Sequence, residues 1–243
     1  MDNALYVGLS RQMTLQRQLQ LTASNIANSD TAGFKVEQLM VRTEPLAPEN
    51  VPIAPINYVL DHGIARNFGQ GPLEQTGATY DVAIDGDGFF SIQTEQGVRY
   101  TRDGRFSVNA ENKLVTKKGD PVLTAAGAEI TLNPQLPSPA IALDGTISQG
   151  NVALGKVGVV RFENLSALQK EGDNLYSVRG DLAPAAAPDA QLRQGMVERS
   201  NVQSVLEITN LIEVTRAYER IAQMMNSTQE LASRAIERLG RSN

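Results

Sequence analysis

The sequence contains no cysteine and no tryptophan, and aromatic residues make up only 5% of its 243 residues. Without cysteine the chain has no disulfide to stabilise it. With so few aromatic residues, we expect a lean core that is mostly aliphatic. The missing cysteine has two interpretations that composition does not separate. It is ordinary for a cytosolic protein, and it also suits a chain that works in an oxidising place or travels unfolded, where a free thiol is a liability.

Long hydrophobic runs and basic clusters are also lacking. No uninterrupted apolar stretch is long enough to span a membrane, so we predict no membrane insertion. The net charge is −5, and no patch of lysine or arginine with interleaved aromatics occurs, which argues against nucleic acid as a partner. Residues 1–6 have neither a basic segment nor a continuous apolar one, so we predict no ordinary cleavable secretory signal.

A long amphipathic helix is predicted over residues 200–239. Apolar or small residues recur there at spacings of three and four, with no proline or glycine between them, as in a coiled coil. This seam consists of Leu211, Val214, Tyr218, Ile221, Met225, Thr228, Ala232, Ala235 and Leu239. A second stripe, formed by Val205, Ile208 and Ile212, widens the apolar face. Ser200 and Gln203 are predicted to form a capping box, and Gly240 to end the helix. A helix about 60 Å long needs a partner along most of its length.

A weaker helical pattern covers residues 3–28. Leu5, Leu15, Leu19 and Ile26 lie on one seam, which is interrupted by Gly8, Gln12 and Thr22. Such a helix is marginal alone and becomes plausible with a long partner helix. The alternative is a frayed amphipathic helix folded onto the body of the protein.

The chain then becomes extended. Asn28, Ser29 and Asp30 compete for backbone hydrogen bonds and end the helix, and Gly33 permits the turn that follows. Four prolines within residues 45–55 exclude helix, so residues 36–75 are predicted as an extended connector rich in proline and glycine. Short strands are possible at 37–42 and 56–60, with a turn at 61–63. The only histidine, His62, lies in that turn, where we expect a solvated side chain.

Residues 76–199 have the pattern of an antiparallel β domain. Short segments of alternating hydrophobicity, such as 80–84, 157–162 and 176–178, are separated by turn signals every 8–12 residues. Together with the terminal helices, this predicts an α+β fold: a discontinuous coiled-coil domain from residues 1–35 and 200–243, with the β domain inserted between its halves.

Motifs that suggest a catalytic or ligand site are weak. Residues 150–157 nearly match a phosphate-binding loop, but Val157 lacks the hydroxyl that binds Mg²⁺, and a strand follows instead of a helix. Residues 85–88 resemble part of a calcium loop, but position twelve is Gln96 and not glutamate, so a turn is favoured. Nothing fixes the separation of two carboxylates as a glycosidase requires. We therefore predict no catalytic residue, no metal and no cofactor.

The segment 23–35 is similar to the N-terminal signature of flagellar axial proteins, which include rod, hook and hook-associated subunits. Ser24 stands where that family more often has asparagine. The residues that carry this match are Asn25, Asn28, Thr31, Gly33, Phe34 and Lys35. Further matches follow in the family's order: residues 81–90 (D-V-A-I-D-G-D-G-F-F), 100–106 (Y-T-R-D-G-R-F), 172–176 (G-D-N-L-Y), 200–202 (S-N-V) and 216–219 (R-A-Y-E).

The resemblance implies a structural subunit of the bacterial flagellar rod and no enzymatic activity. Its length and its single modest β insert suggest the proximal rod, with a distal-rod subunit as the alternative. Such subunits assemble helically around the axial channel and transmit torque from the motor. The implied partners are other copies of the chain, other proximal-rod and distal-rod proteins, and the flagellar type III apparatus that exports the unfolded chain. The implied location is the rod in the periplasmic space.

We expect the assembly interface to be helical. Its predicted members are Leu15, Leu19, Ile26, Val205, Ile208, Leu211, Ile212, Tyr218, Ile221, Met225 and Leu239. In this interpretation the terminal helices order mainly on assembly. A hypothesis from another class is a secreted β-domain binding protein that dimerises through its terminal coiled coil. That protein would need a pocket with converging titratable groups.

Overall fold

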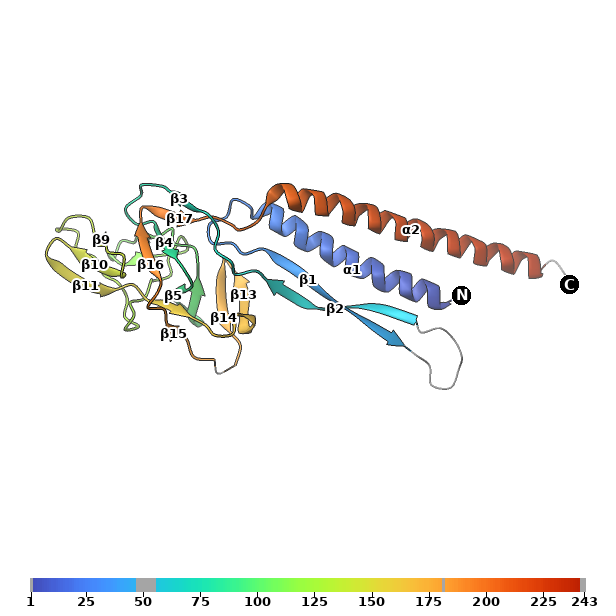
Figure 1. Cartoon of the computed structure of the whole chain (residues 1–243), viewed down its shortest axis with the longest axis horizontal. Coiled ribbons are helices and arrows are strands. Elements are labelled where there is room, and N and C mark those ends of the chain that lie inside the picture. The colour runs from blue at the N-terminus through green and yellow to red at the C-terminus, as the bar shows by residue number, and fades with distance from the viewer. Residues whose placement is uncertain (1, 47–55, 181, 241–243) are drawn as a thin grey trace. The chain divides into compact units, whose positions relative to one another are not determined.

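The computed structural model describes residues 2–46, 56–180 and 182–240 (Figure 1). The chain divides into two compact units. One comprises Met1–Ala27, Glu37–Arg66 and Gln203–Asn243, and the other comprises Asn28–Val36 and Asn67–Val202. The terminal helices pack together, and antiparallel sheets are inserted between them in the sequence, so the predicted α+β fold is confirmed.

The first unit contains two helices and one β-hairpin. Helix α1 (Asp2–Ala27) lies between helix α2 (Ser204–Gly240) and the hairpin of β1 (Glu37–Leu46) and β2 (Ile56–Arg66), and it contacts all three elements (Figure 1). The two helices run antiparallel, because early α1 meets late α2. The amide of Gln12 donates a hydrogen bond of 2.9 Å to the Tyr218 hydroxyl. A frayed N-terminal helix folded elsewhere is therefore not what the structure shows.

The hairpin differs from the expected extended connector. The strands β1 and β2 pair in register from Glu37 with Arg66 to Leu46 with Ile56, so the two possible short strands are real but longer than predicted. The predicted turn at 61–63 is wrong. Residues 61–63 lie inside β2. Opposite them, the pairing register shifts between Met40 and Val41 of β1, which marks a β-bulge. The error arose because an Asp-His-Gly sequence suits a bulge as well as a turn. Pro48, Pro52 and Pro55 lie outside the described residues.

Helix α2 begins four residues later than the predicted capping box. The Ser200 hydroxyl accepts a hydrogen bond from the backbone N–H of Val202, which is a local turn and not a helix cap. The first helical bond runs from the N–H of Glu207 to the carbonyl of Gln203. A serine side chain can satisfy a nearby backbone donor in either setting, so the S-x-x-Q pattern did not discriminate. Gly240 is the last residue of the described helix.

The second unit is built from short antiparallel strands. Its largest sheet has six strands in the order β13-β14-β6-β5-β12-β15, and smaller ladders join β11-β10-β9, β16-β4, β17-β3 and β7-β8. The strands are β3 (Leu73–Gln75), β4 (Val82–Asp85), β5 (Phe89–Thr94), β6 (Gly97–Thr101), β7 (Ser107–Val108), β8 (Leu114–Val115), β9 (Ala140–Ile141), β10 (Thr146–Gln149), β11 (Val152–Lys156), β12 (Val159–Arg161), β13 (Leu168–Gly172), β14 (Leu175–Val178), β15 (Ala185–Ala186), β16 (Gln191–Gln194) and β17 (Met196–Glu198). A short 3₁₀ helix (Leu165–Ala167) precedes β13.

Two buried clusters form the core of this unit. The larger is aliphatic with two phenylalanines, Phe90 and Phe106, whose rings meet edge to face at 5.1 Å. The smaller is aromatic and includes Phe89, Phe162 and Tyr176. Phe89 and Phe90 point to opposite faces of β5, as neighbours in a strand must, and each therefore enters a different cluster. The turn at residues 85–88 connects β4 and β5, which pair with other strands and not with each other.

Candidate assembly interface

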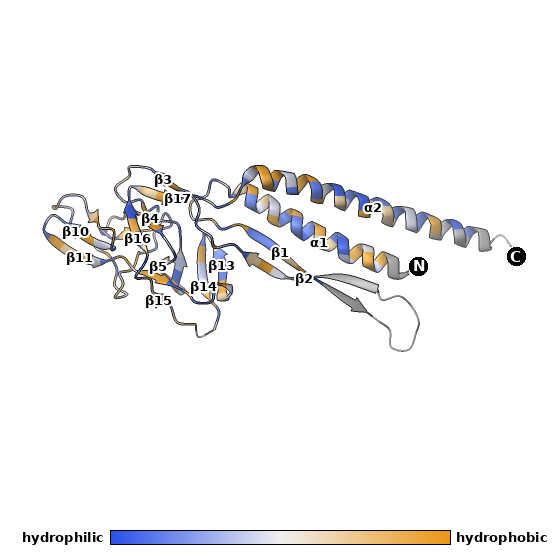
Figure 2. Ribbon diagram, in the orientation of Figure 1, coloured by the Kyte–Doolittle hydropathy of each residue, from blue (hydrophilic) through white to orange (hydrophobic). Residues whose placement is uncertain are grey.

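The outer face of helix α2 is apolar over its first turns. Val205, Ile208 and Ile212 are 81%, 47% and 48% exposed. With 100° of rotation per residue, these three side chains lie on the face opposite Val214, which is buried against the rest of the first unit. The beginning of α2 is accordingly coloured as hydrophobic in Figure 2. Exposed aliphatic side chains grouped in this way indicate a contact surface.

The inner face of α2 follows the predicted seam. Val214 is buried, and the other described members, Leu211, Tyr218, Ile221, Met225 and Thr228, are half-buried. The side chains of Ala232, Ala235 and Leu239 lie outside the described residues. Within the single chain this seam therefore faces inward, while the stripe of Val205, Ile208 and Ile212 faces outward.

The packing of helix α1 explains why small and polar residues interrupt its apolar seam. Leu15 is buried, and Leu5, Leu19 and Ile26 are half-buried. Gly8 permits close approach, because a Cβ there would lie 3.0 Å from the Cγ of Met225. Gln12 bonds to Tyr218, and Thr22 is buried. The polar and small positions that weakened the helical pattern are thus packing positions.

Asn25 organises the junction between α1 and β1. Its side chain is 2% exposed. Its amide donates to the backbone carbonyl of Glu37 at 2.8 Å, and its oxygen accepts from the N–H of Glu37 at 3.0 Å. The same amide donates to the Glu207 carboxylate at 3.2 Å, and the carboxylate of Glu37 is paired with Arg66 at 2.7 Å. One asparagine therefore links α1, the hairpin and α2.

Glu207 is a residue that the sequence analysis missed. It is 7% exposed and stands seven residues before Val214, so it lies on the inner face of α2. The sequence did carry a sign of its role, because Glu207 is a charged residue on the otherwise apolar inner face of α2. Its partner Asn25 was found only through the family signature.

The remaining signature residues belong to the second unit. Gly33 has a φ of +69°, and a Cβ at this position would lie 2.5 Å from the backbone nitrogen of Asp103. Phe34 is 1% exposed, and the Lys170 ammonium lies 4.1 Å from the centroid of its ring. The backbone N–H of Thr31 bonds to the carbonyl of Asn28, closing the turn between them. These contacts explain the signature as a folding element of this chain.

A buried charge cluster holds the end of the signature. The Lys35 ammonium is 2.5 Å from the Glu198 carboxylate and donates to the carbonyl of Gly69 at 2.8 Å. Arg102 binds the other carboxylate oxygen at 3.0 Å. Burial lowers the pKa of Lys35, and the Glu198 carboxylate opposes that shift. Among the residues that the structure describes, the Nε of Arg102 has no hydrogen-bond partner, and the guanidinium lies over the Phe89 ring at 5.4 Å.

Glu198 was also missed by the sequence analysis. It follows Met196 and Val197 at the end of β17 and is 1% exposed. A single glutamate carboxylate balances two buried cations, so it fixes both the signature segment and the bend after β6 that carries Arg102. The sequence contained only a weak sign that this glutamate is buried: it directly follows two apolar strand residues.

The signature also meets the tip of the β13–β14 hairpin. Asp173 and Asn174 both have positive φ, 48° and 57°, as the two central residues of a type I′ turn require. The Asn174 amide donates to the carbonyl of Ala32 at 3.0 Å, and the Asn174 carbonyl accepts from the Thr101 hydroxyl at 2.9 Å. The two sequence motifs 23–35 and 172–176 therefore interact directly at this point.

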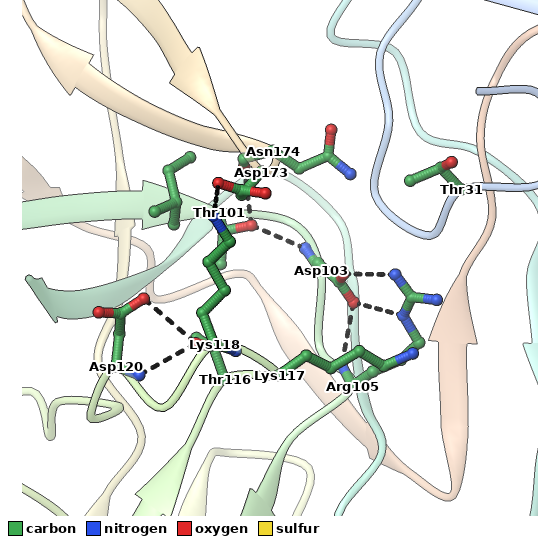
Figure 3. A pocket seen from close by; sticks show the side chains of 11 residues that line it. Thr31, Thr101, Asp103, Arg105, Thr116, Lys117, Lys118, Asp120, Asp173 and Asn174 are labelled. Carbon is green, nitrogen blue, oxygen red and sulfur yellow. Dashed lines mark hydrogen bonds and ion pairs between the residues drawn. The ribbon is translucent and has the colours of Figure 1, made fainter. Parts of the chain in front are cut away.

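A cavity of about 210 Å³ beside this turn contains many charged groups (Figure 3). Four of these groups form two ion pairs: Arg105 with Asp103 at 2.6 Å, and Lys118 with Asp173. Side chains that are already paired with each other have little capacity left to bind a ligand, so we assign this cavity no binding role. Within the described residues no cluster of histidine, aspartate or glutamate is arranged to hold a metal ion. Nor does any described helix have the length and apolarity to cross a membrane.

Two terminal helices that pack together, with an inserted β unit and an exposed apolar face on α2, are typical of a structural protein that assembles with other subunits. Comparison with known families agrees. Residues 5–35 match the model described as "Flagella basal body rod protein", residues 83–149 match "Flagellar hook protein FlgE/F/G D1 domain", and residues 193–238 match "Flagellar basal body rod FlgEFG protein C-terminal".

Full-length relatives narrow the class. The chain is 54% identical to the flagellar basal-body rod protein FlgF of Caulobacter vibrioides, over 100% of both chains. It is 36% identical to FlgF of Mesorhizobium japonicum over 99% of each chain, and 30% identical to the rod protein FlgG of Bacillus subtilis over 97% of this chain and 98% of the relative. The chain belongs to the FlgF family of flagellar basal-body rod proteins.

This membership settles the broad function. The chain is a structural subunit of the flagellar basal-body rod and not an enzyme, and it assembles with rod subunits. The hypothesis of a secreted β-domain binding protein is not supported, because the family matches include both terminal helices and the β region. The residues expected at the helical interface remain predictions about assembly.

Proposed function

We propose that the chain is a proximal-rod subunit that assembles helically around the axial channel and transmits torque from the motor. Its partners are other copies of itself and the other proximal-rod and distal-rod proteins. The observation that carries this proposal is the outward stripe of Val205, Ile208 and Ile212. Because α2 already packs on α1 through its inner seam, the outer stripe is available to a neighbouring subunit.

Stiffness follows from this arrangement. A helix that is packed on both faces resists bending and sliding more than a helix with one solvated face. Contacts between unlike surfaces that do not close into a ring produce helical assemblies. Torque would then be carried by many interlocked helices, with the buried links at Asn25 fixing each subunit's own helices and hairpin.

We further propose that the chain is exported unfolded by the flagellar type III apparatus and functions in the periplasmic space. The sequence contains no cysteine, and an unfolded chain entering an oxidising compartment gains from having no free thiol. The terminal helices would order mainly when neighbours cover their outer faces, because an isolated helical pair buries little surface.

The division into a helical domain (1–35 and 200–243), a connector (36–75) and a β domain (76–199) is retained as a proposal about folding. Limited proteolysis of the purified monomer tests it. A protected core near residues 76–195 with rapid loss of both ends supports this division. A core that retains residues 28–36 supports folding along the two compact units instead.

The position in the rod can be measured directly. We expect an epitope-tagged copy in isolated basal bodies to be located by immuno-electron microscopy at the proximal part of the rod, and deletion of the gene to abolish swimming. Label at the distal rod would overturn the proximal assignment. Normal swimming with complete basal bodies after deletion would overturn the proposed rod function.

A further inference from the structure

The chain passes between its two compact units at four points in the sequence, 27–28, 36–37, 66–67 and 202–203. At three of these points, the residue at the boundary of the second unit or next to it is Val36, Asn67 or Asn201. All three residues belong to the second unit, and the side chain of Asn201 joins them.

Asn201 uses both ends of its amide. Its oxygen accepts a hydrogen bond from the backbone N–H of Val36 at 2.8 Å. Its nitrogen donates to the carbonyls of Asn67 and Gly69 at 2.8 and 2.9 Å. The backbone N–H of Asn201 also donates to the carbonyl of Phe34 at 3.4 Å. One residue therefore connects three segments that are far apart in the sequence.

The Asn201 amide takes the place of one bond of a β ladder. Val36 and Asn67 directly follow the pair of Glu37 and Arg66 at the base of the β1–β2 hairpin, and the N–H of Asn67 donates to the carbonyl of Val36 at 3.0 Å. In a regular antiparallel ladder, the N–H of Val36 would donate to the carbonyl of Asn67 in return. Here both of these groups bind the Asn201 amide instead.

This arrangement suits an asparagine, because its amide presents a donor and an acceptor side by side, as a peptide group does. The segment that leads into α2 is thereby spliced onto the ends of both hairpin strands. The carbonyl of Gly69 also accepts from the Lys35 ammonium at 2.8 Å, so it keeps a partner when Asn201 is replaced. Val36, Asn67 and residue 201 itself are therefore the positions at which the role of the side chain can be measured.

We propose that Asn201 is a positioning residue that holds the two hairpin ends and the segment before α2 together as one joint. Without it, these three segments would leave the second unit separately, each with its own backbone freedom. The mechanical consequence rests on the proposed rod function: force that enters the second unit is passed on through one joint instead of three separate linkers.

Amide hydrogen exchange in the purified full-length chain, followed by NMR, tests the joint. The indicator amides are the N–H of Asn67 and the N–H of residue 201, because neither donates to the Asn201 side chain. We expect Asn201→Ala to lower the protection factors of both by about tenfold, the effect of losing a net hydrogen bond. The N–H of Leu123, bonded to the carbonyl of Ser91 at 2.9 Å in the β core, should keep its protection.

Two matched variants separate the parts of the amide. Asn201→Asp keeps the acceptor for the N–H of Val36 but loses the donor to Asn67, so the amide of Val36 should stay protected while that of Asn67 exchanges faster. Asn67→Ala removes a neighbouring side chain and keeps the backbone carbonyl that Asn201 binds, so it should leave both indicator amides unchanged.

The mechanical consequence is tested in cells by the diameter of swimming zones in soft agar, with each variant expressed at the wild-type level. We expect Asn201→Ala to give smaller zones than the wild type, and Asn67→Ala to give zones of normal size. Normal zones for Asn201→Ala, despite fast exchange at the indicator amides, would overturn the mechanical role.

The remaining outcomes are distinct. Faster exchange confined to the N–H of Val36 in Asn201→Ala would show that the side chain only satisfies its direct partners, and would overturn the joint while leaving the rod function intact. Faster exchange at Leu123 as well would show general loss of stability of the second unit and would also overturn it. Absence of the wild-type chain from basal bodies would overturn the rod function itself.

Discussion

The side chain of Asn25 binds both the N–H and the carbonyl of a single residue, Glu37, at 3.0 and 2.8 Å. An amide is suited to this task because it presents a donor and an acceptor side by side, as a neighbouring strand does. The donor is shared with the Glu207 carboxylate at 3.2 Å. The strand β1 therefore begins where α1 places it, and α2 is held at the same point.

Replacing Asn25 tests this relationship. Asn25→Leu removes both hydrogen bonds and leaves two buried backbone groups unpaired, so we expect the free energy of unfolding to fall by about 2–5 kcal/mol. Asn25→Asp should also destabilise, because the carboxylate cannot donate and lies beside Glu207. Urea unfolding followed by circular dichroism measures both. The control is Gln20→Leu on the exposed face of α1, and an equal loss there would contradict the assignment.

Gly33 and Gly77 form a matched pair for testing the signature turn. Their φ values are nearly equal, +69° and +70°, but a Cβ at Gly33 meets backbone atoms at 2.5 Å, whereas one at Gly77 meets nothing within 4 Å. Both alanine variants incur the cost of a left-handed conformation, about 1–2 kcal/mol. Gly33→Ala should lose about 1–3 kcal/mol more through the backbone clash. Equal losses of unfolding free energy would contradict the close approach.

The buried cluster predicts unequal effects at its two ends. Glu198→Gln leaves Lys35 and Arg102 buried without a counter-charge, and we expect a loss of about 3–5 kcal/mol. Lys35→Met removes one cation and keeps the Glu198–Arg102 pair, so its cost should be no more than about 2 kcal/mol. Urea unfolding of the two variants compares them. A larger loss for Lys35→Met would show that the lysine, and not the carboxylate, dominates the cluster.

Asp144 provides a pH test at the surface. Hydrogen bonding to the Lys156 ammonium, 3.0 Å away, and then to Thr146 lowers the pKa of Asp144 to about 2, from the usual 3.8. Because the folded pKa is depressed, the stabilisation is complete above pH 3.8 and disappears as the pH falls through about 2.

Lys156→Gln should therefore raise the pKa of Asp144 toward 3.8 without reaching it, because the Thr146 hydrogen bonds remain. Carboxyl carbon shifts followed by NMR over pH 1.5–5 measure this pKa. An unchanged value in the variant would show that Lys156 does not contribute to the shift.

How far the sequence predicts this structure depends on the range of each interaction. The seam from Leu211 to Met225 was predictable, because helical spacing is local and the inner face follows it. The pairing of β1 with β2 was not predicted, because the prolines suggested a connector and the paired residues lie 10 to 29 positions apart in the sequence. A capping box was predicted at Ser200, although the same hydroxyl serves a turn.

The residues of the candidate interface and of the buried junctions also differ in how far the sequence predicts their roles. The stripe of Val205, Ile208 and Ile212 is visible in the sequence as a second apolar line. The roles of Asn25 and Lys35 required the structure, because their partners Glu37, Glu207 and Glu198 are fixed by tertiary packing. The family signature located these residues, and the contacts supply the physical reason for them.

The central claim is that the outward apolar stripe of α2 is an assembly surface. Its most direct test compares Ile212→Glu with Gln223→Glu by measuring how much of each tagged variant is present in isolated basal bodies. Both positions are exposed on the same face of α2 and gain the same charge, but only Ile212 belongs to the stripe. We expect Ile212→Glu to be lost from basal bodies while the β unit remains folded by circular dichroism, and Gln223→Glu to be incorporated normally. Normal incorporation of Ile212→Glu, with swimming intact, would contradict the account.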